Sequence, residues 1–324
     1  MEKYIDELFT ESILSEGLAQ FGVISKKKLG DFENYVFEGS LGDQPVIVRF
    51  THSSHRTAVE IESELHWLMY LKSNSADVCG PLPSLHNNMI EKIIADDRNT
   101  FFVCMFEKAK GNSVDIKKEL HNPSLLTAWG KATGKLHHIT KRYSKPPEIP
   151  KRSDLISSFS SQFDPYLPDD GLIKKRVNHV VQKTRSIPQT PETYGLIHSD
   201  IHSGNFFFDG REVFIFDFDD AGYHYLASDL AIPLYYSLLH ISDKKTRDEE
   251  AGRFLFYFLK GYEQLSTLPP GCLNDLEVLM MFRDCELYGV LNKKWDTTQL
   301  NEKQAGFLNG IKVRILEATP LVSL

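Results

Sequence analysis

Residues 196–231 read LIHSDIHSGNFFFDGREVFIFDFDDAGYHYLASDLA, and their pattern of polar and apolar residues decides the fold. A β-prone apolar run follows Asn205, the turn signal Asp209-Gly210 comes next, and a second apolar run ends at Asp217. This pattern predicts a two-stranded hairpin. Because the second strand of a hairpin runs back beside the first, we expect Asn205 and Asp217 to lie at the same end of the sheet.

Asp200 lies in the predicted loop that leads into this hairpin, five residues before Asn205. Amide and carboxylate oxygens are hard ligands, and Mg²⁺ is commonly held by one or two of them together with the phosphates of its substrate. We therefore expect Asn205 and Asp217 to bind the metal. Asp200 would accept or orient the proton of an attacking hydroxyl, as in other phosphoryl-transfer sites.

Two simpler interpretations compete with this one. His198, Asp200 and His202 offer nitrogen and oxygen ligands for a transition metal, but no further His or Cys cluster lies near enough in the sequence to complete such a site. The acidic FDFDD segment would also suit a solvated turn. However, Asp217 directly follows the apolar run FIF, and a carboxylate at the end of such a strand needs a partner.

The same residues resemble the signature of a known family. The order His198, Asp200, Asn205, then Asp217 in FDFDD and Asp229 in SDLA is similar to that of the aminoglycoside phosphotransferase and choline kinase family, a branch of the protein-kinase-like fold. The resemblance implies Asp200 as catalytic base, Asn205 and Asp217 as metal ligands, and His198 with Asp229 as braces of the loop.

The loop departs from the usual family form at two positions. The family commonly has HGDLHPGN where this chain has HSDIHSGN, so Ser199 replaces a glycine and Ser203 replaces a proline. Both of the replaced residues govern backbone shape rather than reactivity. The reactive positions themselves are all present.

The chain has 324 residues, of which 41% are hydrophobic and 25% charged, and this length suffices for two lobes. Its net charge of -7 argues against nucleic acid and against anionic membranes as partners, because those surfaces select basic proteins. The four cysteines lack CxxC spacing, and no apolar run is long enough to span a membrane. We expect a reduced, cytoplasmic protein. No oligomeric state follows from the sequence.

The order of the predicted elements indicates an α+β, bilobal protein-kinase-like fold. Residues 1–107 predict a small antiparallel-sheet lobe with five strands and one main helix at 57–72. Residues 108–324 predict a larger, mostly helical lobe that carries the catalytic loop and the acceptor site. The segment 145–170, rich in Pro, Ser and Asp, predicts an insertion on the substrate side with a helix in it. The other predicted helices cover 125–140, 228–239, 247–265, 273–293 and 301–316.

The nucleotide side is expected in the first lobe. In kinase-like folds a basic side chain on the third strand neutralises phosphate charge and is held by an acid on the following helix. Arg49 and Glu64 are the candidates for this pair, which the resemblance supports, and Glu60 is the rival acid one helical turn earlier. A solvated helix acid is the alternative interpretation of Glu64.

The remaining nucleotide contacts rest on the resemblance. Gly30 and Asn34 belong to the hairpin tip LGDFENY, which would cover the phosphates, although one glycine by itself favours an ordinary β-turn. Adenine would lie near Met105, Phe106 and Lys108. These positions imply ATP as the phosphate donor, with GTP open as an alternative, and Mg²⁺ as the metal.

The acceptor is less defined than the donor. Acids that could surround it would favour amines and amino alcohols electrostatically; they are Asp200, Asp219, Asp220, Asp284 and Glu286. The sequence therefore predicts an ATP- and Mg-dependent phosphotransferase acting on a hydroxyl of a small molecule, namely an amino alcohol, a sugar or an aminoglycoside-like compound. A protein Ser/Thr kinase of the stress-response type, or a nucleotide-binding protein without transfer activity, are the alternatives.

Overall fold

The computed structural model describes residues 3–324, and the chain divides into two compact units. Unit 1 contains the described residues up to Lys110, together with Tyr143–Arg152 and Phe214–Asp219. Unit 2 contains Gly111–Arg142, Ser153–Val213 and Asp220–Leu324. The predicted domains, 1–107 and 108–324, stay a prediction.

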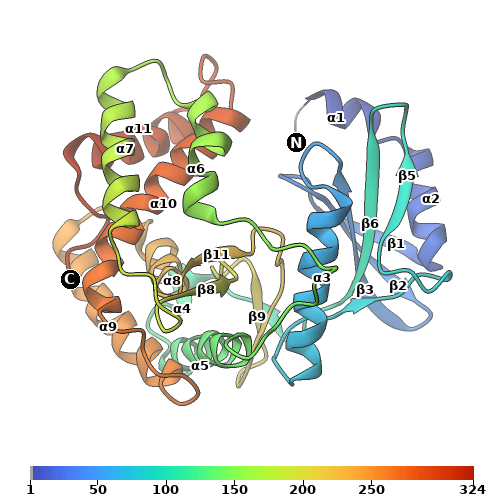
Figure 1. Cartoon of the computed structure of the whole chain (residues 1–324), viewed down its shortest axis with the longest axis horizontal. Coiled ribbons are helices and arrows are strands. Elements are labelled where there is room, and N and C mark those ends of the chain that lie inside the picture. The colour runs from blue at the N-terminus through green and yellow to red at the C-terminus, as the bar shows by residue number, and fades with distance from the viewer. Residues whose placement is uncertain (1–2) are drawn as a thin grey trace. The chain divides into compact units, whose positions relative to one another are not determined.

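Unit 1 is built around an antiparallel sheet with the strand order β1-β2-β3-β6-β4, in which β5 also pairs with β6. Three helices accompany this sheet in the chain (Figure 1). The elements are α1 (Lys3–Leu8), α2 (Glu11–Phe21), β1 (Ile24–Gly30), β2 (Tyr35–Leu41), β3 (Gln44–His52), α3 (Ala58–Ser73), β4 (Pro81–Leu82), β5 (Glu91–Ile94) and β6 (Thr100–Glu107).

Strand β6 shows how the sheet of unit 1 is buried on both faces. Its residues alternate in direction, as in any strand. Phe101, Val103 and Met105 belong to the core that contains residues of α2, whereas Phe102 and Cys104 belong to a second core with residues of α3. The near-continuous apolar run TFFVCMF therefore predicts a central strand covered by helices on two sides.

Unit 2 is mostly helical, with two small sheets that carry the loop of interest. One sheet has the order β10-β9-β7 and the other pairs β8 with β11; strand β10 (Val213–Ile215) is where the chain passes from unit 2 to unit 1. The other elements are β7 (Asn112–Ser113), α4 (Ile116–Glu119), α5 (Pro123–Thr140), α6 (Leu155–Phe163), the 3-10 helix η1 (Asp164–Tyr166), α7 (Gly171–Arg185), β8 (Tyr194–Ile197), β9 (Phe206–Phe208), β11 (Gly222–Tyr225), α8 (Ser228–Leu238), α9 (Lys244–Tyr262), α10 (Cys272–Lys294) and α11 (Glu302–Glu317).

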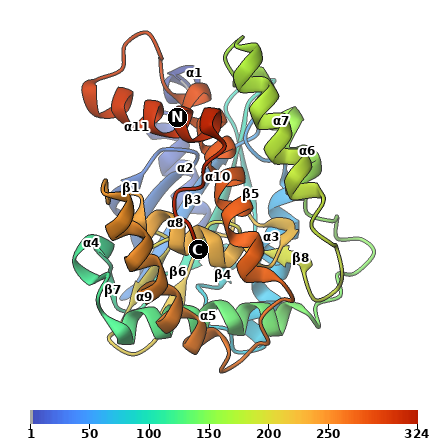
Figure 2. The same ribbon diagram turned by 90° about the vertical axis from the view of Figure 1, so that its left-hand side faces the viewer.

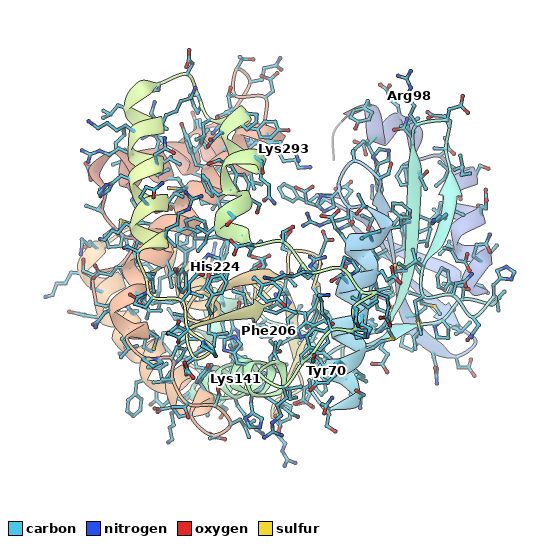
Figure 3. The ribbon with its side chains drawn as sticks, in the orientation of Figure 1. Tyr70, Arg98, Lys141, Phe206, His224 and Lys293 are labelled. Carbon is cyan, nitrogen blue, oxygen red and sulfur yellow. The ribbon has the colours of Figure 1, made fainter. Side chains whose placement is uncertain are left out.

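Two helix contacts organise unit 2. Helices α5 and α9 pack so closely that a Cβ atom at Gly130 would lie 1.8 Å from the backbone oxygen of Phe258, and one at Gly261 would lie 1.9 Å from that of Thr127. Helix α10 packs against α7, α8 and α11 (Figure 2). At the start of β9, Phe206 is fully buried and packs on Trp129 of α5, with ring centroids 4.7 Å apart (Figure 3). The loop before β9 is thereby anchored to α5.

The predicted α+β class is confirmed. The predicted helix at 57–72 and those at 125–140, 228–239, 247–265, 273–293 and 301–316 are all present, with ends that differ by at most three residues. The hairpin is also present: the backbone N–H of Asp209 donates to the carbonyl of Glu212 at 3.2 Å, and Gly210 has a φ of 96°. The segment 145–170 contains helix α6. The strands β4, β7, β8 and β11 and the helices α4 and α7 were not predicted from the sequence.

Two further properties concern the chain as far as it is described. Within residues 3–324 no helix is both long enough and apolar enough to cross a membrane. All four cysteines are free and buried. The cytoplasmic location stays a prediction.

Candidate active site

The loop between β8 and β9 is held in place by a buried aspartate. Asp229, at the start of α8, accepts hydrogen bonds from the backbone N–H groups of His198 at 3.0 Å and Ser199 at 2.8 Å. Its Oδ2 also lies 3.1 Å from Nε2 of His137, and both side chains are fully buried. Because a carboxylate only accepts, His137 donates from Nε2, and its Nδ1 forms a hydrogen bond with the hydroxyl of Tyr262, 2.8 Å away. Asp229 thus braces the loop, as the resemblance implies.

Ser199, at the position where the family commonly has glycine, adopts a backbone conformation that favours glycine. Its φ is 66°, in the left-handed region that residues with a side chain rarely occupy. Its hydroxyl donates to the backbone carbonyl of Asp220 at 2.6 Å, which offsets part of this cost. The serine therefore preserves the loop shape that its replacement of glycine put at risk.

Asp200 follows directly and is held at both carboxylate oxygens. Nη2 of Arg283, on α10, donates to Oδ1 at 2.5 Å. Nδ2 of Asn205 donates to Oδ2 at 3.0 Å, and Nε2 of His202 lies 3.4 Å from the same oxygen. His198 is fully buried, and its Nδ1 accepts from the backbone N–H of Asp200 at 3.3 Å. The structure therefore brings together Asp200 and Asn205, both predicted from the sequence.

The hydrogen bonds of Asn205 fix which way its amide group points. Nδ2 donates to the backbone carbonyl of Asp200 and to its Oδ2, each at 3.0 Å. With the nitrogen committed to Asp200, the amide oxygen is the atom that remains for another ligand. A neutral hard oxygen of this kind suits Mg²⁺, which takes only one or two protein ligands beside phosphates.

The charges around Asp200 shift two carboxyl groups in opposite directions. Burial raises the pKa of Asp200, but the charge of Arg283 and the contact with His202 outweigh it, so that its pKa lies below the ordinary value. Glu286, 3.2 Å from Arg283, is also mostly buried, and its burial raises the pKa to about 6 although the same arginine opposes the change. Asp200 is therefore ionised at neutral pH.

In unit 1, the structure pairs Arg49 with Glu64. Nη1 and Nη2 of Arg49 donate to the two carboxylate oxygens of Glu64 at 2.8 and 2.7 Å, and the side chains are only 5% and 1% exposed. Burial would lower the pKa of Arg49, yet the charge of Glu64 holds it well above its ordinary value. The rival acid, Glu60, instead forms a capping box with Thr57 at the start of α3. The solvated-acid interpretation of Glu64 is wrong.

Asp219 contacts two other segments of unit 1, one at Asn34 and one at His55 and Arg56. It accepts from Nδ2 of Asn34 at 3.1 Å and from Nε of Arg56 at 3.3 Å, and it lies 2.6 Å from Nε2 of His55. Thr51 in turn donates to Oδ1 of Asn34 at 2.6 Å. Burial raises the pKa of Asp219, but Arg56 and His55 lower it well below its ordinary value. Asp219 was predicted to be one of the acids around the acceptor, but its carboxylate is engaged in these contacts within unit 1.

Asp217 belongs to unit 1, whereas Asp200 and Asn205 belong to unit 2. It lies two residues beyond the end of β10, is exposed, and has a φ of 65°. The next residue, Phe218, is buried against Trp67 of α3, with ring centroids 5.3 Å apart. This packing fixes the chain on one side of Asp217, whose exposed carboxylate offers the hard oxygens that a metal requires.

The other nucleotide-side candidates lie on the sheet of unit 1. Gly30 ends β1, and a Cβ atom there would meet nothing within 4 Å, so sterics do not demand a glycine. Met105 is buried in the core, the ring of Phe106 lies 5.0 Å below the guanidinium of Arg49, and Lys108 donates to Glu38 at 2.9 Å. The roles of these residues toward a nucleotide stay predictions.

Asp284 does not contribute to an acidic acceptor site. It is 1% exposed, and its two carboxylate oxygens accept from Nε and Nη2 of Arg314 at 2.8 and 2.5 Å. The hydroxyl of Tyr235 donates to the same group at 2.6 Å. Asp284 therefore joins α8, α10 and α11. Of the two acids of α10 predicted to surround the acceptor, Glu286 is the one whose side chain contacts that of Arg283.

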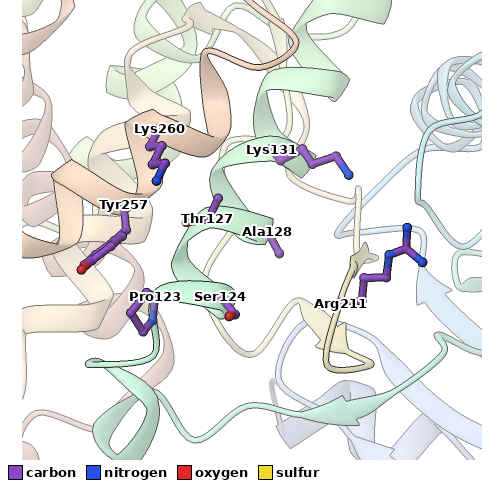
Figure 4. A pocket seen from close by; sticks show the side chains of 8 residues that line it. All are labelled: Pro123, Ser124, Thr127, Ala128, Lys131, Arg211, Tyr257 and Lys260. Carbon is purple, nitrogen blue, oxygen red and sulfur yellow. The ribbon is translucent and has the colours of Figure 1, made fainter.

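A surface pocket in unit 2 is separate from these residues. It has a volume of about 290 Å³ and lies between α5, α9 and the turn that carries Arg211 (Figure 4). Its lining includes Lys131 and Lys260 but none of the residues predicted for the site. Because Lys131 is already paired with Glu212 at 2.9 Å, the basic character of this pocket is partly neutralised.

Arg283 is the residue that sequence reasoning missed. Its partner Asp200 is 83 residues away in the chain, and no local pattern links them. The i,i+3 pairing with Glu286 was visible, but such a pair is usual on solvated helix faces. Only the packing of α10 beside the loop reveals the contact.

Comparisons with known proteins show which family the chain matches. Residues 27–268 match the model of a family described as the phosphotransferase enzyme family. The amicoumacin kinase of Bacillus subtilis (strain 168) is 31% identical over 332 residues, an alignment that covers 100% of this chain and 97% of that protein.

Solved structures show the same fold. An amicoumacin kinase, hAmiN, in complex with AMP-PNP, Ca²⁺ and Ami has a TM-score of 0.90 at 29% identity, covering 100% of this chain and 98% of that one. The microcompartment-associated aminopropanol kinase has a TM-score of 0.76 at 18% identity, covering 97% of this chain and 100% of that one. At the latter identity the likeness concerns the fold alone.

Proposed function

The chain belongs to the phosphotransferase enzyme family, and from this membership we propose that it transfers the γ-phosphoryl group of ATP to a hydroxyl group of a small molecule. The family resemblance and the protein-kinase-like fold predicted from the sequence are confirmed. The phosphate donor, the metal and the acceptor are the parts that we propose.

The observation that carries the proposal is the pair of hydrogen bonds that the Asp200 carboxylate accepts, one from Asn205 and one from Arg283. The amide nitrogen of Asn205 holds Oδ2 of Asp200 at 3.0 Å, and Arg283 holds Oδ1 at 2.5 Å. An ionised carboxylate fixed in this way suits the orientation of a hydroxyl for in-line attack. The loose transition state of phosphoryl transfer requires positioning more than strong basicity, so the lowered pKa of Asp200 is compatible with this role.

Asp200 is accordingly proposed as catalytic base, and Asn205 and Asp217 as the ligands of Mg²⁺. Both ligands offer hard oxygens, and metal bound with the nucleotide would neutralise charge on its phosphates. Arg49, held by Glu64, is proposed to contact phosphate oxygens, while Gly30, Asn34, Met105, Phe106 and Lys108 are the proposed nucleotide contacts. The complex of a relative with AMP-PNP and Ca²⁺ supports a nucleotide and a divalent metal.

We propose an amine-bearing acceptor, with amicoumacin as the first compound to test. Similarity to an amicoumacin kinase extends over the whole chain at 31% identity. Glu286 interacts electrostatically with both Asp200 and Asp220, and negative charge gathered around it would attract an ammonium group. GTP is the alternative donor in the same assay.

The decisive test is a transfer assay with amicoumacin, an amino alcohol and an aminoglycoside, followed by mass spectrometry of each acceptor. The wild type should add one phosphoryl group to an amine-bearing acceptor. Asp200→Asn should lose about 10²–10⁴-fold in turnover and retain nucleotide affinity. Full activity in this variant would refute the mechanism. A phosphoryl group found on protein instead of on a small molecule would support a protein kinase. Nucleotide binding without any transfer would support a non-catalytic protein.

The metal assignment has a separate test. Nucleotide affinity, measured by calorimetry, should rise when Mg²⁺ is added to chelator-treated protein. Asp217→Asn should weaken this dependence, because one anionic ligand oxygen is lost. A nucleotide affinity that responds neither to Mg²⁺ nor to this substitution would overturn the assignment of Asp217.

A further inference from the structure

Arg283 makes four polar contacts at the end of its side chain. Nη2 donates to Oδ1 of Asp200 at 2.5 Å and to the hydroxyl of Tyr236 at 3.0 Å. Nε donates to the same hydroxyl at 3.2 Å, and Nη1 donates to Glu286 at 3.2 Å. The guanidinium also lies 5.4 Å from the centre of the Tyr236 ring. The group is therefore fixed by residues on both α8 and α10.

We propose that Arg283 is the positioning residue of the transfer reaction: it holds the carboxylate of Asp200 in the orientation that meets the acceptor hydroxyl. This role of Arg283 rests on the proposed function, in which Asp200 is the catalytic base. It adds a residue outside the loop, on a helix 83 positions further along the chain.

The geometry explains why such a residue is needed. Rotation about the Cβ–Cγ bond of an aspartate is soft, so one hydrogen bond from Asn205 to Oδ2 does not fix the plane of the carboxylate. A second donor on Oδ1 does fix it. Each carboxylate oxygen can accept about two hydrogen bonds, so the contact with Arg283 still leaves room for an incoming hydroxyl.

An arginine is suited to this position because its donors are arranged in a rigid fork. Asp200, Tyr236 and Glu286 are each contacted by different donor directions of one planar group. Tyr236 also packs against the ring of His202, with centroids 4.9 Å apart, and His202 approaches Oδ2 of Asp200. A lysine would keep the charge and lose most of these simultaneous contacts.

Arg283→Met removes the charge and the fork while it keeps an unbranched side chain of similar bulk. The expected result is a fall in kcat on the order of 10²-fold, with the acceptor KM and the nucleotide affinity changed by less than about threefold, because orientation rather than binding is lost. Arg283→Lys should recover about tenfold of this loss, since the charge returns without the fork.

The chain supplies a matched control on the neighbouring helix α11. Arg314 forms an ion pair with Asp284 of α10 at 2.5 Å, and its side chain is 16% exposed against 18% for Arg283. None of the hydrogen bonds and ion pairs of Arg314 in the described part of the chain involves Asp200. Arg314→Met should destabilise the fold to a similar extent and leave kcat within about threefold of the wild type. A loss of kcat that is equal in the two methionine variants would show that Arg283 acts only through the fold.

A double-substitution cycle separates positioning from every other role. In the Asp200→Asn background, Arg283→Met should reduce the residual rate less than about threefold, because residues that act as a unit are strongly non-additive. If the two losses multiply, Arg283 does not act through Asp200 and the inference is wrong. The melting temperatures of the wild type, the two single variants and the double variant give the same cycle without substrate. Additive shifts in melting temperature would also show that the inference is wrong.

The two proposals fail in different ways. If the wild type phosphorylates no acceptor, the proposed function fails, and the melting-temperature cycle still decides whether Asp200 and Arg283 are coupled. If the wild type is active and Arg283→Met behaves like Arg314→Met, the proposed function stands and the inference fails.

Discussion

Asp229 accepts a hydrogen bond from the backbone N–H of Ser199 at 2.8 Å, and through this contact a buried carboxylate sets the position of the residue before Asp200. Asp229→Ala should lower the free energy of unfolding by about 3–5 kcal/mol, because two backbone N–H groups and His137 lose their buried acceptor. Urea denaturation measures the loss. Asp243→Ala is the control, since Asp243 accepts from a backbone N–H at an exposed helix start, and its loss should be about 1 kcal/mol. Equal losses would contradict the assigned role of Asp229.

Ser199 offers a pair of substitutions with opposite backbone effects. Ser199→Ala keeps the Cβ atom at a φ of 66° and removes the hydroxyl that donates to the carbonyl of Asp220, so it should cost about 1 kcal/mol of stability. Ser199→Gly loses the same hydrogen bond but recovers about 1 kcal/mol of backbone strain, and it should remain close to the wild type. Thermal unfolding of the three proteins ranks them. Alanine more stable than glycine would argue against strain at this position.

The contact of α5 with α9 predicts a contrast between two glycines of α9. Gly261→Ala should destabilise by about 3 kcal/mol, since its Cβ atom would lie 1.9 Å from the backbone oxygen of Thr127. Gly252→Ala, with nothing within 4 Å of its Cβ atom, should stabilise by about 0.5–1 kcal/mol through helix propensity. Chemical denaturation of both variants tests the contrast. Similar values for the two would mean that the helices pack less closely.

The buried ion pair of unit 1 predicts a non-additive result. Arg49→Met alone should cost about 3–5 kcal/mol, because it leaves Glu64 buried without its partner. The double variant Arg49→Met/Glu64→Leu should be more stable than Arg49→Met, since neither charge then remains. Urea denaturation gives both values. A double variant less stable than the single one would show that packing, not unpaired charge, dominates.

Glu286 predicts a dependence of stability on pH. Burial raises its pKa from 4.5 to about 6, so folding favours the protonated form. Its stabilising contribution is therefore complete below pH 4.5 and is lost as the pH rises through about 6. Relative to Glu286→Gln, the wild type should lose about 2 kcal/mol across this interval. Denaturation curves at several pH values measure the difference, and a constant difference would exclude the raised pKa.

The loop and its hairpin were predictable because their signals are local. Asp200, Asn205 and the turn at Gly210 lie within a few residues of one another, and alternation and turn chemistry determine their structure. The sequence predicted the ion pair of Arg49 with Glu64, with Glu60, one helical turn earlier, as the rival acid. The choice against Glu60 required the structure, because a capping box is formed by the same kind of acid.

Other features depend on contacts between distant segments. Nothing local to Asp219 indicates that it joins Asn34, His55 and Arg56. Helix α7 was missed because its buried positions are mostly valine and isoleucine, whose branched side chains lower helix propensity. Arg283 was missed because ion pairs on a helix are usually solvated, and only its tertiary contact with Asp200 distinguishes it.

The division of the chain into units also constrains how the protein forms during synthesis. The chain passes between the units after Lys110, Arg142, Arg152, Val213 and Asp219. Unit 1 therefore lacks Asp219, which contacts two other segments of the unit, until the ribosome has produced about two thirds of the chain. Truncation after residue 110 would leave Asn34, His55 and Arg56 around a missing carboxylate. During synthesis, unit 1 therefore gains its last segment, Phe214–Asp219, only after more than a hundred residues beyond Lys110 have been added to the chain.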